Sequence, residues 1–191
     1  MQTFYSRETI ALWERFYRAN FINTMSGFKS VSLIASRSKY GHNNLAIFSN
    51  IVHLGADPPL IGFVNRPIEA APHTITNIKE TGIYTINLIT PELVDKAHQS
   101  SAKYDRHINE FEATGIEEEY REGIPVPFVK PSPVKYAVEL KEIIPISYNG
   151  TFFVIGEVTG VLINPELLQQ DGFLQLENAN VMTSLGIDAY Y

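Results

Sequence analysis

The stretch that decides the fold reads GHNNLAIFSN (residues 41–50), PPLIGFVNRP (58–67) and HTITNIKETGIYTINL (73–88). Small polar residues punctuate its apolar, strand-like runs, namely Asn44, Ser49, Asn65, Thr74 and Asn77. A single arginine, Arg66, lies among them. Strands of this kind supply apolar walls and their ends supply hydrogen-bond donors. This mix suits a ligand with a flat apolar body and an anionic tail.

Apolar runs with strand periodicity predict a mainly β chain. We expect strands at residues 29–36, 44–49, 59–64, 83–89, 134–142 and 151–163. Asn149-Gly150 predicts a hairpin between the last two strands, while Gly156 and Gly160 predict bulges in the last one. Many antiparallel strands with a few added helices predict a closed barrel, and we expect a single domain over residues 1–191.

Three helices are expected around these strands. Residues 9–21 carry an apolar stripe at helical spacing and should pack on the barrel or on a partner. Residues 72–80 should form a helix with Thr74 at or near its N-cap and Gly82 as a left-handed C-cap. A third helix is expected over residues 91–101.

Composition excludes several classes of protein. The chain has 191 residues, of which 45% are hydrophobic and 19% charged, a globular balance without the signature of disorder. A net charge of -6 argues against a nucleic-acid partner. No apolar run is long enough to span a membrane, and residues 1–8 lack the apolar core of a signal peptide, so a cytoplasmic location is the default expectation. The chain has no cysteine and its five histidines are not spaced as metal ligands, so no metal site is expected.

The order of the short motifs resembles the flavin reductase-like family, whose fold is the FMN-binding split barrel. The matching residues are, in chain order, Asn44, Ala46 and Ser49, then Pro58-Pro59, then Thr74, Asn77 and Ile78, and finally Thr81, Gly82 and Asn87. The resemblance covers nearly the whole chain and implies an antiparallel Greek-key split β-barrel with additional α-helices. One departure is Pro72-His73, which replaces the family's Lys-Asp and removes the usual cation.

The resemblance implies an oxidoreductase that binds FMN and passes a hydride to it from NADH or NADPH. The cofactor carries this chemistry, so no catalytic side chain is expected. The expected cofactor-binding residues are Asn44, Ala46, Phe48 and Ser49 around the ring and ribityl chain, and Arg66, His73 and Thr74 around the phosphate. The reduced flavin would serve a monooxygenase or another acceptor. The nicotinamide, the acceptor, and the choice between bound cofactor and substrate stay open.

Other interpretations stay open as well. A non-catalytic flavin-binding or storage module would share all these binding residues. A haem or pyridoxal-type ligand is a third possibility, and a haem would need an axial histidine in an apolar pocket. His53 is the one histidine with two apolar neighbours. Taken alone, Arg66 could be a surface residue and His73 could simply cap its helix. The resemblance places His98 where the family often has residues near the flavin ring, but a polar helix residue is the favoured interpretation.

A homodimer with the FMN sites at or near the interface is also expected. The N-terminal segment carries Trp13, Phe16, Tyr17 and Phe21, and residues 185–191 end in two tyrosines. Such aromatic surface is enriched at interfaces, and the family resemblance implies a two-fold dimer. The alternative is that these aromatics pack on their own barrel.

Overall fold

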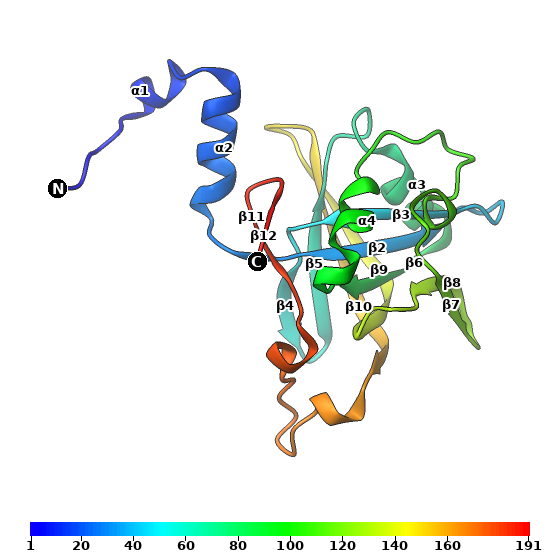
Figure 1. Cartoon of the computed structure of the whole chain (residues 1–191). Coiled ribbons are helices and arrows are strands. Elements are labelled where there is room, and N and C mark those ends of the chain that lie inside the picture. The colour runs from blue at the N-terminus through cyan, green and yellow to red at the C-terminus, as the bar shows by residue number, and fades with distance from the viewer.

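The computed structural model describes residues 1–191, and its core is a seven-stranded antiparallel sheet (Figure 1). The strand order is β3-β2-β6-β9-β10-β5-β4. These strands are β2 (Ser32–Arg37), β3 (Asn43–Phe48), β4 (Val52–Ala56), β5 (Pro59–Asn65), β6 (Ile83–Leu88), β9 (Val134–Ile146) and β10 (Thr151–Ile163). The mainly β prediction is therefore confirmed, although β4 was not anticipated.

The sheet curls into a barrel that remains split along one seam. Phe48 of β3 and Phe63 of β5 meet edge to face with ring centroids 5.0 Å apart, although four strands separate β3 from β5 in the sheet. The strands at the two ends of the order, β3 and β4, do not pair with each other. The side chain of Asn50 instead reaches β5, where its Nδ2 donates to the Val64 carbonyl at 2.9 Å and its Oδ1 accepts from the Val64 N–H at 3.2 Å.

Two apolar clusters lie on opposite faces of β2, which is why that strand is almost wholly buried. The barrel interior holds Ile34, Phe63, Ile75, Ile78, Tyr84, Ile86, Val138 and Val154. The outer cluster holds Val31, Leu33, Ala35, Leu45, Ile89, Leu93, Ala97, Phe111, Ile116, Val126 and Val129. Successive side chains of a strand point to opposite faces. Ile34 of β2 therefore packs into the barrel interior, while Leu33 and Ala35 pack into the outer cluster.

Short helices cover the sheet where its clusters would otherwise be open. They are α3 (Pro72–Thr81), η1 (Pro91–Leu93), α4 (Val94–Gln99) and α5 (Glu110–Thr114), with η2 (Pro165–Leu167) and η3 (Leu176–Ala179) nearer the end of the chain. A separate hairpin pairs β7 (Glu118–Arg121) with β8 (Ile124–Val129). The predicted start of α3 at Pro72, its left-handed cap at Gly82 (φ 75°) and the bulges at Gly156 and Gly160 are all confirmed.

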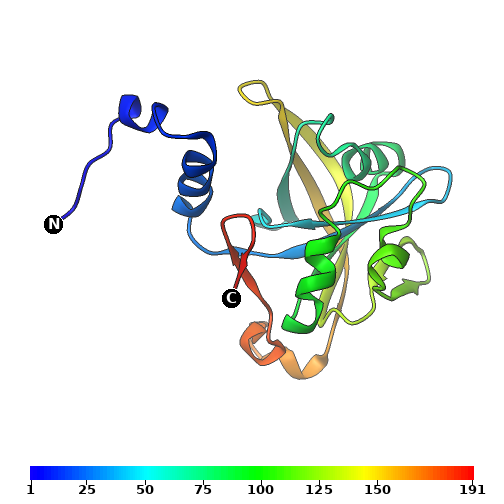
Figure 2. The same ribbon diagram turned by 45° about the horizontal axis from the view of Figure 1, so that its top comes forward.

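The N-terminal segment differs from its prediction. It forms two helices, α1 (Arg7–Ala11) and α2 (Arg15–Met25), instead of one helix over residues 9–21. Glu14 interrupts the helix because its carboxylate caps α2, accepting from the N–H groups of Phe16 and Tyr17. Neither helix has a buried residue, and both stand away from the barrel in two views (Figures 1 and 2). Of the two expected alternatives, packing on its own barrel does not occur, and packing on a partner stays a prediction.

The segment that follows α2 meets the C-terminal end of the chain in a small sheet beside the barrel. In it β1 (Lys29–Ser30) pairs with β11 (Thr183–Leu185), which forms a hairpin with β12 (Ala189–Tyr190). The hairpin tip lies close to the last turn of α2, since a Cβ at Gly186 would come within 3.2 Å of the Thr24 methyl group. None of the helices combines the length and the apolar character that crossing a bilayer requires.

Candidate functional site

The candidate site is a cavity of about 680 Å³, a volume typical of sites for small ligands. It opens where β3 ends at the seam, and α3, the segment after α4, and the C-terminal hairpin form its other walls. The structure places all seven predicted site residues in its lining, namely Asn44, Ala46, Phe48, Ser49, Arg66, His73 and Thr74. Residues 30 positions apart in the sequence thus converge on one space, as the motif order predicts.

One wall of the cavity is the free edge of β3. This strand pairs only with β2, so alternate backbone groups point away from the sheet. The N–H of Leu45 shows this orientation, because it donates to the Glu110 carboxylate at 3.2 Å across the edge. The N–H of Ile47 has the same orientation two residues later. The edge therefore presents backbone donors and acceptors to a ligand in the cavity.

A second wall is the beginning of α3. Its N-cap is Ala71, which has no side chain able to cap, and Pro72 occupies the first turn. The remaining N–H groups of that turn are free, and together with the helix dipole they form a favourable place for an anion. Thr74 is not the N-cap, which corrects the sequence prediction. Its hydroxyl instead accepts a hydrogen bond from Asn44 Nδ2 at 3.0 Å.

A buried polar network fixes these two walls against each other. Asn44 Nδ2 also lies 3.4 Å from Ser36 Oγ, and Asn77 Nδ2 donates to the same oxygen at 3.2 Å. Asn77 thus ties α3 to β2, which is a structural role. Because both amide protons of Asn44 are engaged, its carbonyl oxygen is the atom available to a ligand, so Asn44 offers an acceptor and not the expected donor.

The charges of the cavity are unevenly distributed. Arg66 and Lys103 line it, are exposed, and form no ion pair. Burial and the nearby Arg106 guanidinium lower the pKa of His73, so this imidazole is neutral at pH 7 and offers a hydrogen bond but no charge. Burial raises the pKa of Glu110 to about 6. Both cations come from residues outside α3, and the carboxylate lies at the edge of β3.

Several lining residues were not anticipated from the sequence. Glu110, Lys103 and Tyr190 come from a charged irregular segment and from the end of the chain, and no motif marks them. His98, interpreted as a polar helix residue, also lines the cavity. Its Nδ1 lies 2.7 Å from the Tyr190 hydroxyl. This pairing joins residues 92 positions apart, a separation at which local sequence patterns carry no signal.

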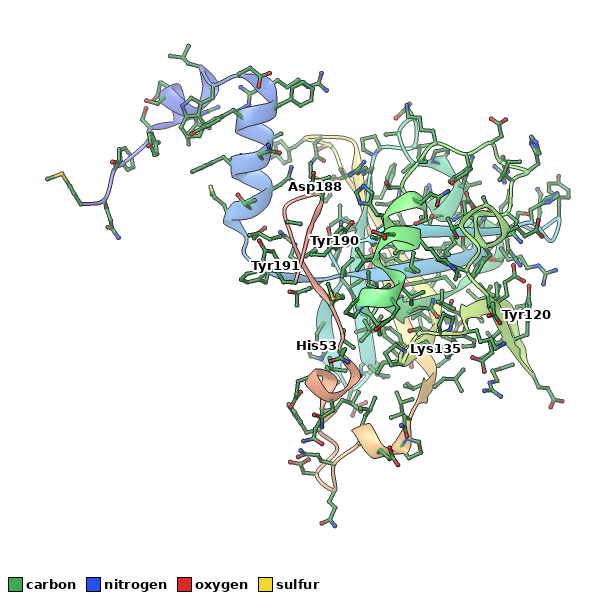
Figure 3. The ribbon with its side chains drawn as sticks, viewed as in Figure 1. His53, Tyr120, Lys135, Asp188, Tyr190 and Tyr191 are labelled. Carbon is green, nitrogen blue, oxygen red and sulfur yellow. The ribbon has the colours of Figure 1, made fainter.

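His53 does not fit the haem alternative. It lies exposed on β4, outside the lining of the cavity (Figure 3). An axial haem ligand needs an apolar pocket around it. The apolar neighbours of His53 in sequence, Val52 and Leu54, are themselves exposed.

Comparison with known proteins relates this site to a family. The model of the flavin reductase like domain matches residues 25–177. A protein with a split barrel domain from Shewanella frigidimarina, provisionally named a flavin reductase, is 44% identical with a TM-score of 0.95, and the match covers 100% of this chain and 94% of that chain.

Two more distant structures share the fold. Nitrilotriacetate monooxygenase component B from Bacillus cereus is 19% identical with a TM-score of 0.88, covering 100% of this chain and 95% of that one. An FMN-binding protein from Thermus thermophilus is 17% identical with a TM-score of 0.71, covering 88% of each chain. The family match spans most of the chain and agrees with the split barrel observed. The chain therefore belongs to the flavin reductase-like family.

Proposed function

We propose that the protein binds FMN in the cavity and transfers a hydride to it from NADH or NADPH. The observation that carries this proposal is the convergence of all seven predicted residues on one cavity with an anion-favouring end and a hydrogen-bonding edge. Membership of the flavin reductase-like family supports a flavin as the ligand. The FMN-binding protein from Thermus thermophilus, which shares the fold, supports FMN among the flavins.

The two walls suggest how the ligand would be oriented. The phosphate would lie at the first turn of α3, where Arg66 supplies a charge and His73 a hydrogen bond. The guanidinium has forked donors suited to phosphate oxygens, and this arrangement replaces the cation missing at Pro72-His73. The ring and ribityl chain would lie along the β3 edge, with Ala46, Phe48 and Ser49 beside them. Thr74 would act through Asn44, whose amide it holds.

When bound, the flavin supplies the hydride-accepting chemistry. The chain's own contribution is to bind and orient the ring, to anchor the phosphate and to limit the access of water on one side through the C-terminal hairpin. No lining residue needs to act as an acid or base for hydride transfer to the ring. The reduced flavin would pass its electrons to a monooxygenase or another acceptor, as the name of the Bacillus cereus relative suggests for that protein.

We also propose that the protein is a homodimer. The exposed apolar side chains of α1 and α2 support this assembly, since Leu12, Phe16 and Met25 are all largely accessible to solvent. The cavity reaches these helices, since Asn23 of α2 is part of its lining.

A spectroscopic experiment tests the proposed function. The purified protein is loaded with FMN, separated from free flavin, and mixed with NADH or NADPH without oxygen in a stopped-flow instrument. Bleaching of the bound flavin on a turnover timescale is expected with at least one donor. Bound flavin that neither donor bleaches would instead support the storage module. Failure to bind added FMN at micromolar concentration would refute both.

A further inference from the structure

His98 and Tyr190 form a polar pair on the wall of the cavity that the proposed flavin chemistry does not use. His98 comes from α4 and Tyr190 from β12, and both line the cavity. The distance of 2.7 Å between His98 Nδ1 and the Tyr190 hydroxyl is that of a strong hydrogen bond. The rings meet edge to face with centroids 5.9 Å apart, and Tyr190 points from the C-terminal hairpin towards α4 (Figure 3).

The two side chains differ in their access to water. Tyr190 is half-buried and packs against the outer apolar cluster, whereas His98 is exposed. Burial and the neighbouring Asp188 carboxylate raise the pKa of Tyr190, so its phenol stays protonated. A protonated phenol in the cavity, hydrogen-bonded to an imidazole that reaches solvent, is the arrangement of a proton donor with a route for its replacement.

We propose that Tyr190 donates a proton to the carbonyl oxygen of a conjugated ketone or aldehyde bound in the cavity, and that His98 replaces this proton from solvent. The donor suits a substrate whose oxygen gains negative charge when the substrate accepts a hydride, and conjugated carbonyl compounds are one such class. A neutral phenol stabilises an oxygen that gains negative charge during a reaction. In a conjugated carbonyl compound, hydride addition to the distant β-carbon moves the electron pair to that oxygen.

The step balances in atoms and electrons. The substrate gains a hydride, and so two electrons, from the reduced flavin, and it gains one proton from Tyr190. The carbon–carbon double bond is lost, an enol forms, and the enol rearranges to the saturated ketone in solution. Tyr190 recovers its proton through His98, which takes one from water. This inference rests on the proposed function, because the reduced flavin supplies the hydride.

Two ligands separate binding from proton transfer. The substrate probe is trans-4-phenyl-3-buten-2-one, which is added without oxygen to the FMN-loaded protein after reduction of the flavin. The binding probe is the saturated 4-phenyl-2-butanone, which cannot be reduced at a double bond. Its affinity for the oxidised, FMN-loaded protein is measured from the change in flavin absorbance.

Three variants give distinct expected results. Tyr190→Phe should slow reoxidation of the flavin by the unsaturated ketone at least about 100-fold, as expected for loss of a general acid. It should also weaken binding of the saturated ketone about tenfold, because one hydrogen bond is lost. His98→Asn keeps a polar atom near the position of Nδ1 but cannot relay a proton, so it should retain binding and lose rate. Tyr191→Phe is the matched control, since Tyr191 lies on the same hairpin outside the cavity lining.

The outcomes distinguish a failure of this inference from a failure of the proposed flavin reduction. If the wild-type flavin is bleached by a reduced nicotinamide but not reoxidised by the unsaturated ketone, the inference falls and the proposed function stands. Equal rates in Tyr190→Phe and Tyr191→Phe would also overturn it. If the protein binds no FMN, both fall together.

Discussion

Arg66 is the side chain on which the phosphate hypothesis depends most directly. It lines the cavity, is exposed and forms no ion pair that a substitution would disturb. Arg66→Gln should weaken FMN binding by about 10- to 100-fold, because hydrogen bonds to a charged group contribute about 1.5–3 kcal/mol. Binding of riboflavin, which lacks the phosphate, should be unchanged.

Titration of the protein with each flavin, followed by fluorescence quenching, measures both affinities. Arg15→Gln on α2 serves as the control, since Arg15 is exposed and lies outside the cavity lining. An equal loss of FMN and riboflavin affinity in Arg66→Gln would place Arg66 beside the ring and not beside the phosphate.

Tyr84 carries a buried hydroxyl with no partner. The residue is fully buried in the barrel interior, and its Oη forms no hydrogen bond. Gly156 makes room for it, since a Cβ there would lie 2.5 Å from this oxygen. Tyr84→Phe should therefore stabilise the fold by about 1 kcal/mol, because an unpaired buried polar group costs free energy.

Urea unfolding gives the comparison, with Tyr120→Phe as the counterpart. The Tyr120 hydroxyl bonds Asn43 at 2.7 Å and Glu118 at 3.0 Å, so the same change there should destabilise the protein (Figure 3). A destabilised Tyr84→Phe would mean that the Tyr84 hydroxyl has a partner in solution, such as a bound water.

Glu110 makes stability depend on pH. Burial raises its pKa to about 6 from 4.5, so the folded protein holds this proton more tightly than the unfolded chain does. The contribution of protonated Glu110 to the free energy of unfolding is therefore lost as the pH rises from 4.5 through 6. Glu110→Gln removes the ionisation while keeping an acceptor for the Leu45 N–H. It should stabilise the protein by about 2 kcal/mol at pH 8 and by less than half of that at pH 5.

Urea unfolding at these two pH values measures the effect. Glu112→Gln, on the exposed side of the same helix, removes the same charge and should give little difference between them. A gain for Glu110→Gln that does not change with pH would show that the buried carboxylate is not the cause.

Among the elements, α3 and the strands β2 and β3 depend on one another through Ser36. Its fully buried hydroxyl accepts from Asn44 and Asn77. Ser36→Ala should destabilise the fold by about 1–3 kcal/mol and weaken FMN binding, because two buried amides lose an acceptor. Ser32→Ala on the same strand is the matched control. The Ser32 hydroxyl is equally buried but has no partner, so its removal should be neutral or stabilising.

Urea unfolding and FMN titration of both serine variants check this prediction. Equal effects in the two variants would show that the network does not hold the walls of the cavity.

The elements also show how far the sequence predicts the structure. Clean alternation in β9, the Asn149-Gly150 hairpin and the Pro72 and Gly82 boundaries of α3 are local signals, and each was predicted. The strand β4 was not predicted, because its side chains are mostly exposed. A register shift between His53 and Gly55 also interrupts the alternation of inward and outward side chains. The strands β1, β11 and β12 have two or three residues each and exist only through pairing across the chain.

The same distinction holds for the candidate site. The motif residues on β3 and α3 could be predicted because local patterns mark them. Glu110 and Tyr190 could not, because tertiary packing alone brings them to the cavity. Thr74 was expected as a cap because it lies near the start of a helix. Its hydroxyl instead accepts a hydrogen bond from the side-chain amide of Asn44.

At the scale of the whole molecule, the N-terminal helices are the least explained part of a monomer. Tyr5, Trp13, Tyr17 and Phe21 pack among themselves, with Trp13 and Phe21 centroids 4.9 Å apart. The other apolar side chains of this segment face solvent. An isolated helix of 11 residues is marginal in water, so α2 needs a surface to hold it. A two-fold dimer supplies that surface from a second copy of the chain.

The proposed dimer gives the last prediction. Light scattering on the gel-filtration peak should give twice the mass of the chain at micromolar protein. Phe16→Asp places a charge on α2 where the side chain is 71% exposed in the monomer, so it should leave the barrel folded but shift the mass towards that of one chain. Tyr40→Asp is the control, with a side chain 73% exposed at the turn between β2 and β3, on the far side of the barrel from α2.

Circular dichroism verifies that both variants are folded. A wild-type monomer that still binds FMN would overturn the dimer. A dimer unaffected by Phe16→Asp would move the interface away from α2, for example to β4, the other exposed edge of the sheet, where Val52 and Leu54 face solvent. We expect the interface to include α2, because Phe16, Tyr17, Ile22 and Met25 of this helix are all exposed in the single chain.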